Sequence, residues 1–172
     1  MNDDSIFIGI DPGSNKLGFA IIANYFGKVR LVTSGVIVFH KNDSLQKKLL
    51  YVFNYFNELA LGYFKDGNTV FFSLERQYCD KNPQSAFILV AFYSIFLLLA
   101  EEYKNECIVM MPCQIKKLIS GSGKSSKEEL LFFLRKQFNL DLIVSTLDES
   151  DAIAIALCAV LFKNGDRSLS DI

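Results

Sequence analysis

Short blocks of alternating or clustered apolar residues divide the start of the chain into three segments that predict β-strands. The segments cover about residues 5–11, 17–24 and 28–39, and a turn at residues 24–28 separates the last two. Consecutive strands joined by tight turns pair in antiparallel fashion. The pattern therefore predicts an antiparallel meander at the beginning of the fold.

Beyond the meander, helical and strand patterns alternate. A helix is predicted from Ser44, a residue suited to an N-cap, because apolar residues then recur at helical spacing to about Tyr63. The later elements are predicted as a strand over 69–75, a helix over 83–104, a strand over 107–111, a helix over 126–138 and a helix over 148–162. This order predicts an α/β fold with a five-stranded mixed sheet and helices on both faces, built as a single domain over residues 1–172.

The segment at residues 83–104 has no polar face. Its apolar run over 86–100 is interrupted only by Ser94 and is shorter than the roughly 20 residues that a membrane span needs. A helix that is apolar on every side is typical of a protein core or a subunit interface. The first four residues, 1–4, carry no basic signal-peptide region. We therefore expect a cytoplasmic protein with no membrane partner.

Composition adds two constraints. A chain of 172 residues that is 51% hydrophobic can bury a substantial core, which excludes a disordered protein. Its formal net charge of -1 gives no global sign of nucleic-acid binding, so such a partner would have to be held by local basic patches or by metal-bridged phosphates. The four cysteines lack CxxC spacing and are expected to be buried free thiols in a reducing compartment.

Acidic residues recur where strands end and where the last helix begins. Asp11 closes the first strand, Glu75 closes the fourth, and Asp148 and Asp151 share one face of the first turn of the last helix. Buried acids at such positions are costly, and the ends of these strands are where open α/β sheets bind ligands. Four carboxylates at one edge suit Mg²⁺ or Mn²⁺, and two such ions can activate a water for attack on a phosphodiester.

Each acid also has an ordinary structural explanation. Asp148 could be only an N-cap, and Asp151 could be a first-turn acid favoured by the helix dipole. Glu75 could pair with Arg76 or Lys81, and the first acid could belong only to an Asp-Pro-Gly turn. Capping and turn chemistry do not, however, require all four acids together.

Three motifs, in order, give a specific resemblance. They are GIDPGS at residues 9–14, Glu75 followed by Tyr78 and KNPQSA at residues 81–86, and DESDAIAIA at residues 148–156. Together they resemble the RuvC family of Holliday junction resolvases, over about residues 5–162. The order of predicted elements is also that of a ribonuclease-H-like domain, the fold that this resemblance implies.

The resemblance implies an activity, a cofactor and partners. The family's metal-binding catalytic acids would fall on Asp11, Glu75, Asp148 and Asp151, with two Mg²⁺ ions per site and Mn²⁺ as a substitute. The helix at 83–104 would be the homodimer element. The dimer would resolve four-way junction DNA by symmetric paired nicks, and in a bacterial host RuvA and RuvB would be the branch-migration partners.

The resemblance also implies DNA contacts at Tyr78, Lys81, Lys116 and Lys127. Tyr78 would stack on an unpaired base near the crossover, although a half-buried tyrosine beside a strand end is the simpler alternative. The lysines at 116 and 127 belong to a basic region interleaved with Gly and Ser over residues 116–127. Lysines beside a small-residue loop and a helix N-terminus form a phosphate cradle, while a solvated surface is the alternative.

The sequence departs from the bacterial pattern after the second acid. Arg76 and Gln77 resemble a run in poxvirus resolvases, so the resemblance does not decide between a bacterial and a viral source. Glu149 adds a fifth acid between the last pair, and the only histidine, His40, is far from the acids in sequence.

Other functional classes remain as alternatives. The DPGS motif at residues 11–14 also resembles the phosphate-binding strand pair of actin-like ATPases and sugar kinases, but those need two lobes and the chain has room for one. The GSGKS run at residues 121–125 is not a Walker motif, because Leu118 occupies the required first glycine position. A related nuclease acting on RNA or other branched DNA, and a non-catalytic junction-binding protein, are the remaining candidates.

Overall fold

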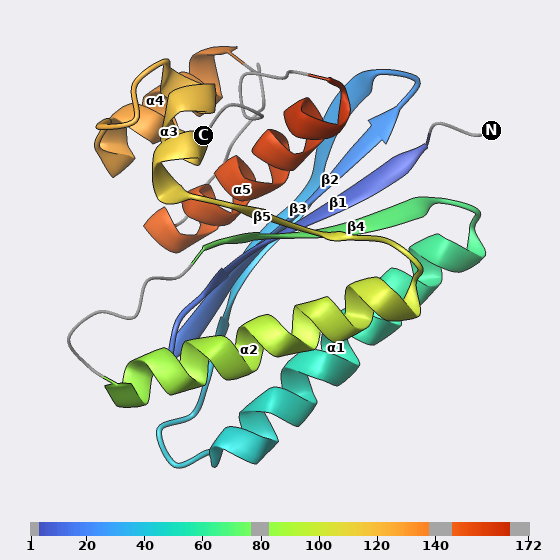
Figure 1. Cartoon of the computed structure of the whole chain (residues 1–172), viewed down its shortest axis with the longest axis vertical. Helices are drawn as coiled ribbons and strands as arrows, with labels where there is room; N and C mark the ends of the chain where they lie inside the picture. The colour runs from blue at the N-terminus through green and yellow to red at the C-terminus, as the bar shows by residue number, and fades with distance from the viewer. Residues whose placement is uncertain (1–3, 77–82, 138–145, 166–172) are drawn as a thin grey trace.

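The computed structural model describes residues 4–76, 83–137 and 146–165, and it is built around one mixed β-sheet (Figure 1). The strands are β1 (Ser5–Pro12), β2 (Lys16–Tyr25), β3 (Lys28–Val38), β4 (Thr69–Glu75) and β5 (Cys107–Met110). Their order across the sheet is β3-β2-β1-β4-β5. The first three strands are antiparallel, and β4 and β5 run parallel to β1. The predicted meander and five-stranded mixed sheet are confirmed.

Helices cover both faces of this sheet, as predicted. They are α1 (Leu45–Lys65), α2 (Pro83–Glu102), α3 (Pro112–Ser120), α4 (Lys127–Gln137) and α5 (Leu147–Lys163). Helices α1 and α2 lie on one face, and α5 lies on the other with α3 and α4 beside it (Figure 1). For the four helices and five strands whose bounds were predicted, the boundaries agree to within two residues, whereas no bounds were predicted for α3.

The two helix starts that the sequence drew attention to have different caps. Ser44 caps α1 as predicted, because its side chain accepts a hydrogen bond from the Lys47 N–H at 3.3 Å. Helix α5 begins at Leu147 and is capped by Thr146, whose hydroxyl accepts from the Glu149 N–H at 3.3 Å. The prediction that α5 begins at Asp148 is therefore wrong by one residue, and the alternative in which Asp148 is only an N-cap is excluded.

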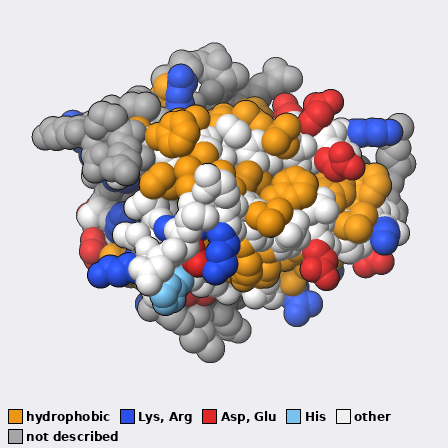
Figure 2. All heavy atoms as spheres, turned by 90° about the horizontal axis from the view of Figure 1, so that it is seen from below, with side chains coloured by type: hydrophobic (Ala, Val, Ile, Leu, Met, Phe, Trp, Pro, Cys, Tyr) orange, Lys and Arg blue, Asp and Glu red, His pale blue; other side chains and the backbone are white. Residues whose placement is uncertain are grey.

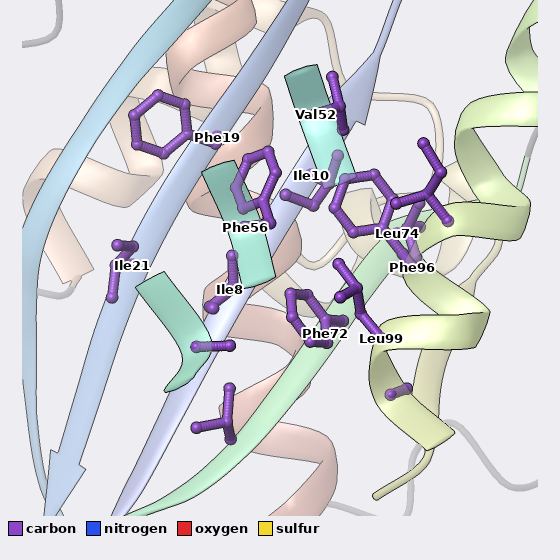
Figure 3. Packing of buried hydrophobic residues seen from close by; sticks show 14 of the residues in the cluster. Ile8, Ile10, Phe19, Ile21, Val52, Phe56, Phe72, Leu74, Phe96 and Leu99 are labelled. Carbon is purple, nitrogen blue, oxygen red and sulfur yellow. The ribbon is translucent and has the colours of Figure 1, made fainter. Parts of the chain in front are cut away.

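Strand alternation sorts the side chains of the sheet into two cores. On β1, Ile6, Ile8 and Ile10 are buried against α1 and α2, as the close view in Figure 3 shows for the last two. Phe7 points to the opposite face, where it belongs to the core beneath α5 and stacks on Phe71 of β4 at 5.1 Å between ring centroids. Every second residue counted from Phe7 on β1 and from Phe71 on β4 thus faces α5.

Helix α2 is apolar on both its inner and its outer side. An 18-residue window, Ser85–Glu102, has a mean hydropathy of 1.8, so the helix meets the length and composition of a membrane span. Its inner side chains Phe92, Phe96 and Leu99 are fully buried against the sheet and α1. The inner side of the helix therefore packs as part of the core, whereas only 28% of the window as a whole is buried.

The cysteines follow the prediction only in part. Cys107, Cys113 and Cys158 are free thiols, and Cys158 is buried. Cys113 is exposed, because it lies in the first turn of α3 on the side away from Ile115 and Ile119, which are buried. The expectation of buried thiols is therefore wrong for Cys113, and Cys79 lies outside the described residues.

Candidate active site

Asp11 and Glu75 lie side by side at one edge of the sheet. Strands β1 and β4 are parallel and pair Ile10 with Leu74, so the acid that follows each of these residues comes at the same level. Successive side chains of a strand alternate between its two faces, so Asp11 points to the same face as Phe7, and Glu75 to the same face as Phe71. This is the face that α5 covers. Strand register and alternation therefore bring both carboxylates to the end of the sheet that α5 covers.

Two glycines allow α5 to rest directly on the strands. A Cβ placed on Gly18 of β2 would lie 2.4 Å from the carbonyl oxygen of Asp148, and one on Gly9 of β1 would lie 2.3 Å from that of Ala152. Because any side chain there would push the helix outward, only glycine permits this approach. Gly18 is also the cross-strand partner of Asp11, so the first turn of α5 is seated next to the strand acid.

The environment of Asp11 shows that the acids converge. Burial is the largest influence and, with the charges of Asp151, Glu75 and Asp148, raises the pKa of Asp11 from 3.8 to about 7, against the opposing effect of Lys127. All three of the other predicted acids therefore act on Asp11. A carboxylate held among other carboxylates in this way is electrostatically suited to a bound cation.

Glu75 lies in the same field and is approached by two lysines. Burial and then the charge of Asp151 raise the pKa of Glu75, while Lys127 and Lys116 lower it. Among the described residues Glu75 forms no ion pair with Arg76, so that structural explanation for the acid does not hold. The other proposed partner, Lys81, lies outside the described residues.

Asp148 and Asp151 of α5 are each paired with one lysine from another element. The ammonium of Lys127, at the start of α4, donates to Asp151, and the ammonium of Lys16, at the start of β2, donates to Asp148. Partial burial acts to lower the pKa of Lys127, but the hydrogen bond and charge of Asp151, with the charges of Asp11 and Asp148, raise it overall. These two ammonium groups, together with the charge of Lys116 near Glu75, face the four carboxylates of the site.

The fifth acid points away from this cluster. The Glu149 side chain is 7% exposed, and its Oε1 accepts a hydrogen bond of 2.7 Å from the Ser34 hydroxyl on β3. This contact fastens the first turn of α5 to the third strand. Glu149 thus supports the fold at this position, whereas Asp148 and Asp151 on either side of it face the strand acids and the lysines.

The donor set fits divalent metal ions, although the carboxylates are not arranged around one common metal position. In the part of the chain that the structure describes, no three Asp, Glu, His or Cys side chains are placed to hold a metal ion between them. Asp148 and Asp151 are engaged by ammonium groups instead. Four hard oxygen donors with strong mutual repulsion at Asp11 nevertheless match what Mg²⁺ or Mn²⁺ prefers, since a divalent cation would remove that repulsion.

Some of the predicted residues are placed by the structure and others are not. It brings together the four acids and Lys127, and it brings Lys116 close enough to act on Glu75. Tyr78 and Lys81 lie outside the described residues. The sequence interpretation missed Lys16, although a lysine five residues after a strand-ending acid, at the start of the antiparallel return strand, is a usable signal.

Known proteins with similar sequences share one description. The family model described as crossover junction endodeoxyribonuclease RuvC matches residues 7–159. A protein of that name from Helicobacter pylori is 33% identical over 150 residues, which are 87% of this chain and 92% of the relative. A second protein of that name, from Chloroherpeton thalassium, is 28% identical over 166 residues, covering 96% of this chain and 87% of the relative.

Solved structures agree on the fold. The Thermus thermophilus RuvC structure matches with a TM-score of 0.77 at 22% identity and covers 93% of this chain and 96% of its own. The same protein in complex with Holliday junction substrate gives a TM-score of 0.76 at 20% identity, covering 94% of this chain and 96% of its own. The RNase H-like fold is therefore confirmed. With the family match over nearly the whole sequence, the chain belongs to the RuvC family of crossover junction endodeoxyribonucleases, the Holliday junction resolvases.

Proposed function

We propose that this chain resolves four-way DNA junctions by Mg²⁺-dependent, symmetric paired nicks, using Asp11, Glu75, Asp148 and Asp151. RuvC-family nucleases are metal-dependent. The single observation that carries the assignment of residues is the convergence of the other three acids on Asp11. Such a cluster has no role in stabilising the fold, because it raises the electrostatic energy of the folded protein.

The four acids would hold two Mg²⁺ ions, with Mn²⁺ as a substitute. When bound, the ions neutralise the phosphate and supply an activated water. We propose that Lys127 and Lys116, whose charges act on Asp151 and Glu75, hold the negatively charged backbone beside the acids. We further propose that Tyr78 stacks on an opened base at the crossover and that Lys81 contacts the DNA backbone near it.

The setting of the enzyme is part of the same proposal. We infer that residues 1–172 work as one nuclease domain and that the protein acts in the cytoplasm, on DNA. If the host is bacterial, we further propose RuvA and RuvB as branch-migration partners.

We propose that the outer face of α2 forms the homodimer contact. Phe87, Val90, Leu97 and Leu98 are exposed on it, and Phe87 is 67% and Leu98 65% accessible to solvent. Figure 2 looks onto this side of the molecule, below α1 and α2 in Figure 1, and shows apolar side chains spread across it. A second copy is the occupant we favour, because a junction has paired strands to cut and RuvC-family enzymes act as dimers.

Leu98→Glu is expected to convert the dimer into a monomer at micromolar concentration. A glutamate on this apolar face would have to be desolvated in the dimer contact, so the dissociation constant is expected to rise at least about 100-fold. Sedimentation equilibrium measures this change. Phe26→Glu is the control, because Phe26 is 80% exposed at the hairpin between β2 and β3, away from α2. An unchanged dimer in the Leu98 variant would contradict the assignment of this face.

The function itself is tested with the unmodified protein. Labelled four-way junction, linear duplex, single strand and an RNA duplex are incubated with and without Mg²⁺, and products are separated on denaturing gels. The proposal expects two nicks of like polarity in the junction only, with Mg²⁺ only. Preferred cutting of RNA would favour the related nuclease, and a junction that is shifted on a native gel but never cut would favour a binding protein.

A further inference from the structure

Lys16 stands on a firmly held turn beside the acid cluster. A Cβ on Gly13 would lie 2.7 Å from the Lys16 carbonyl oxygen, so the turn between β1 and β2 can be this tight only with glycine there. The Phe39 N–H donates to the Asn15 carbonyl at 2.9 Å, and the Lys48 ammonium donates to another carbonyl of the turn at 3.1 Å. The backbone that carries Lys16 is therefore fixed from two sides.

The side chain on this fixed backbone reaches the solvent, and its end is held by one ion pair. The Lys16 side chain is 54% exposed, and its only ion pair among the described residues is with Asp148, which is 23% exposed. Asp151, one turn further along α5, is served by Lys127 from the other side. Asp148 and Asp151 are thus held by lysines from two separate parts of the chain. Only Lys127 lies in the basic region at residues 116–127.

We propose that Lys16 is a further substrate-binding residue, which neutralises Asp148 before metal is bound and transfers to a DNA backbone phosphate once Asp148 takes up a metal ion. This inference rests on the proposed function of the acids. It adds to the site a phosphate contact from the β1–β2 turn, opposite the contact from α4.

Simple electrostatics supports such an exchange. The carboxylate of Asp148 cannot be shared fully between an ammonium group and a divalent ion, and an ion pair as exposed as this one contributes little to stability and breaks easily. A lysine carries a compact charge on a flexible stem, so its ammonium can move a few Å while the backbone stays in place. Metal ions at the acids would draw a phosphate to the position that the released ammonium can reach.

The inference predicts opposite effects on the two ligands. In Lys16→Gln no ammonium group competes with metal for Asp148. This variant is therefore expected to bind Mn²⁺ about two- to fivefold more tightly than the unmodified protein, as measured by calorimetry without DNA. The same variant is expected to bind the junction about three- to tenfold more weakly, but only with a divalent ion present. A lysine that serves only to hold the fold together would lower the melting temperature and change neither affinity in this pattern.

Junction binding is measured with Ca²⁺ and with EDTA, over a range of salt concentrations, with gels that confirm uncut DNA. In Ca²⁺ the slope of log affinity against log salt is expected to fall by about one for Lys16→Gln, and in EDTA it is expected to match the unmodified protein. Lys16→Arg keeps the charge and is expected to restore both affinities. Lys163→Gln is the control, since Lys163 pairs with Glu106 at the far end of α5.

Two kinds of failure are distinguishable. If the unmodified protein binds metal and cuts the junction, but Lys16→Gln leaves Mn²⁺ affinity unchanged or loses junction affinity equally in EDTA and Ca²⁺, the inference about Lys16 is overturned. If the unmodified protein neither binds a divalent ion nor cuts, the proposed function fails first, and the inference fails with it.

Discussion

Asp11→Asn is expected to abolish junction cleavage while leaving junction binding in EDTA, where no metal contributes, within about twofold. The charges of the other three acids all act on Asp11. Replacing Asp11 with asparagine would therefore remove one negative charge from the proposed metal site. Metal ions supply several kcal/mol of transition-state stabilisation, and each 1.36 kcal/mol corresponds to a factor of ten in rate. We therefore expect the single-turnover cleavage rate to fall at least about 1,000-fold. The lysines that we propose as DNA contacts are unchanged, so binding without metal is expected to be preserved.

The matched control for this variant is Asp66→Asn. It makes the same chemical change at the exposed C-cap of α1, on an element that packs against the other face of the sheet. Its cleavage rate is expected to equal that of the unmodified protein. Mg²⁺-dependent nicking by Asp11→Asn at a rate within tenfold of normal would show that the acid cluster is not the catalytic centre.

The sequence was sufficient to predict the sheet and the position of the strand acids. Alternation of Ile6, Ile8 and Ile10 requires that intervening residues face the other way, and Asp11 continues that intervening series. That Asp148 and Asp151 share one face at the start of the last helix was predicted from their spacing of three residues alone. These are local features, fixed by periodicity and by the ends of the elements, and they determine which face of the sheet carries the chemistry.

What the sequence could not predict depends on contacts between distant segments. Nothing local indicates that Lys16 reaches Asp148, or that Glu149 turns toward Ser34 rather than toward the other acids. Both contacts depend on how closely α5 lies on the sheet, which is set by Gly18 on another strand. In the helix itself, the N-cap fell at Thr146 because its hydroxyl reaches the Glu149 N–H, and one residue of shift was enough to remove Asp148 from a capping role.

The same cluster that is expected to cut DNA should weaken the fold, and this leads to a second effect of Asp11→Asn. Because the folded-state pKa of Asp11 is raised from 3.8 to about 7, the folded protein binds a proton more tightly than the unfolded chain does. The stability contributed by the protonated acid is fully present below about pH 4 and is lost as the pH rises through about 7. By linkage, the loss cannot exceed about 4 kcal/mol, and residual solvent access makes about 1–3 kcal/mol the expected value.

Asparagine carries no such charge, so Asp11→Asn is expected to be more stable than the unmodified protein by about 1–3 kcal/mol at pH 8 in EDTA, and by clearly less at pH 5. Urea unfolding at the two pH values measures the difference, and Asp66→Asn should follow the unmodified protein at both. Adding Mg²⁺ at pH 8 should stabilise the unmodified protein and affect Asp11→Asn much less, because bound metal neutralises the charge that the variant lacks. Parallel pH profiles for Asp11→Asn and the unmodified protein would mean that burial and the neighbouring acids do not raise the pKa of Asp11. A cluster that costs stability without metal and recovers it with metal is what a nuclease centre requires, whereas a buried acid with a purely structural role would show the pH response but no response to Mg²⁺.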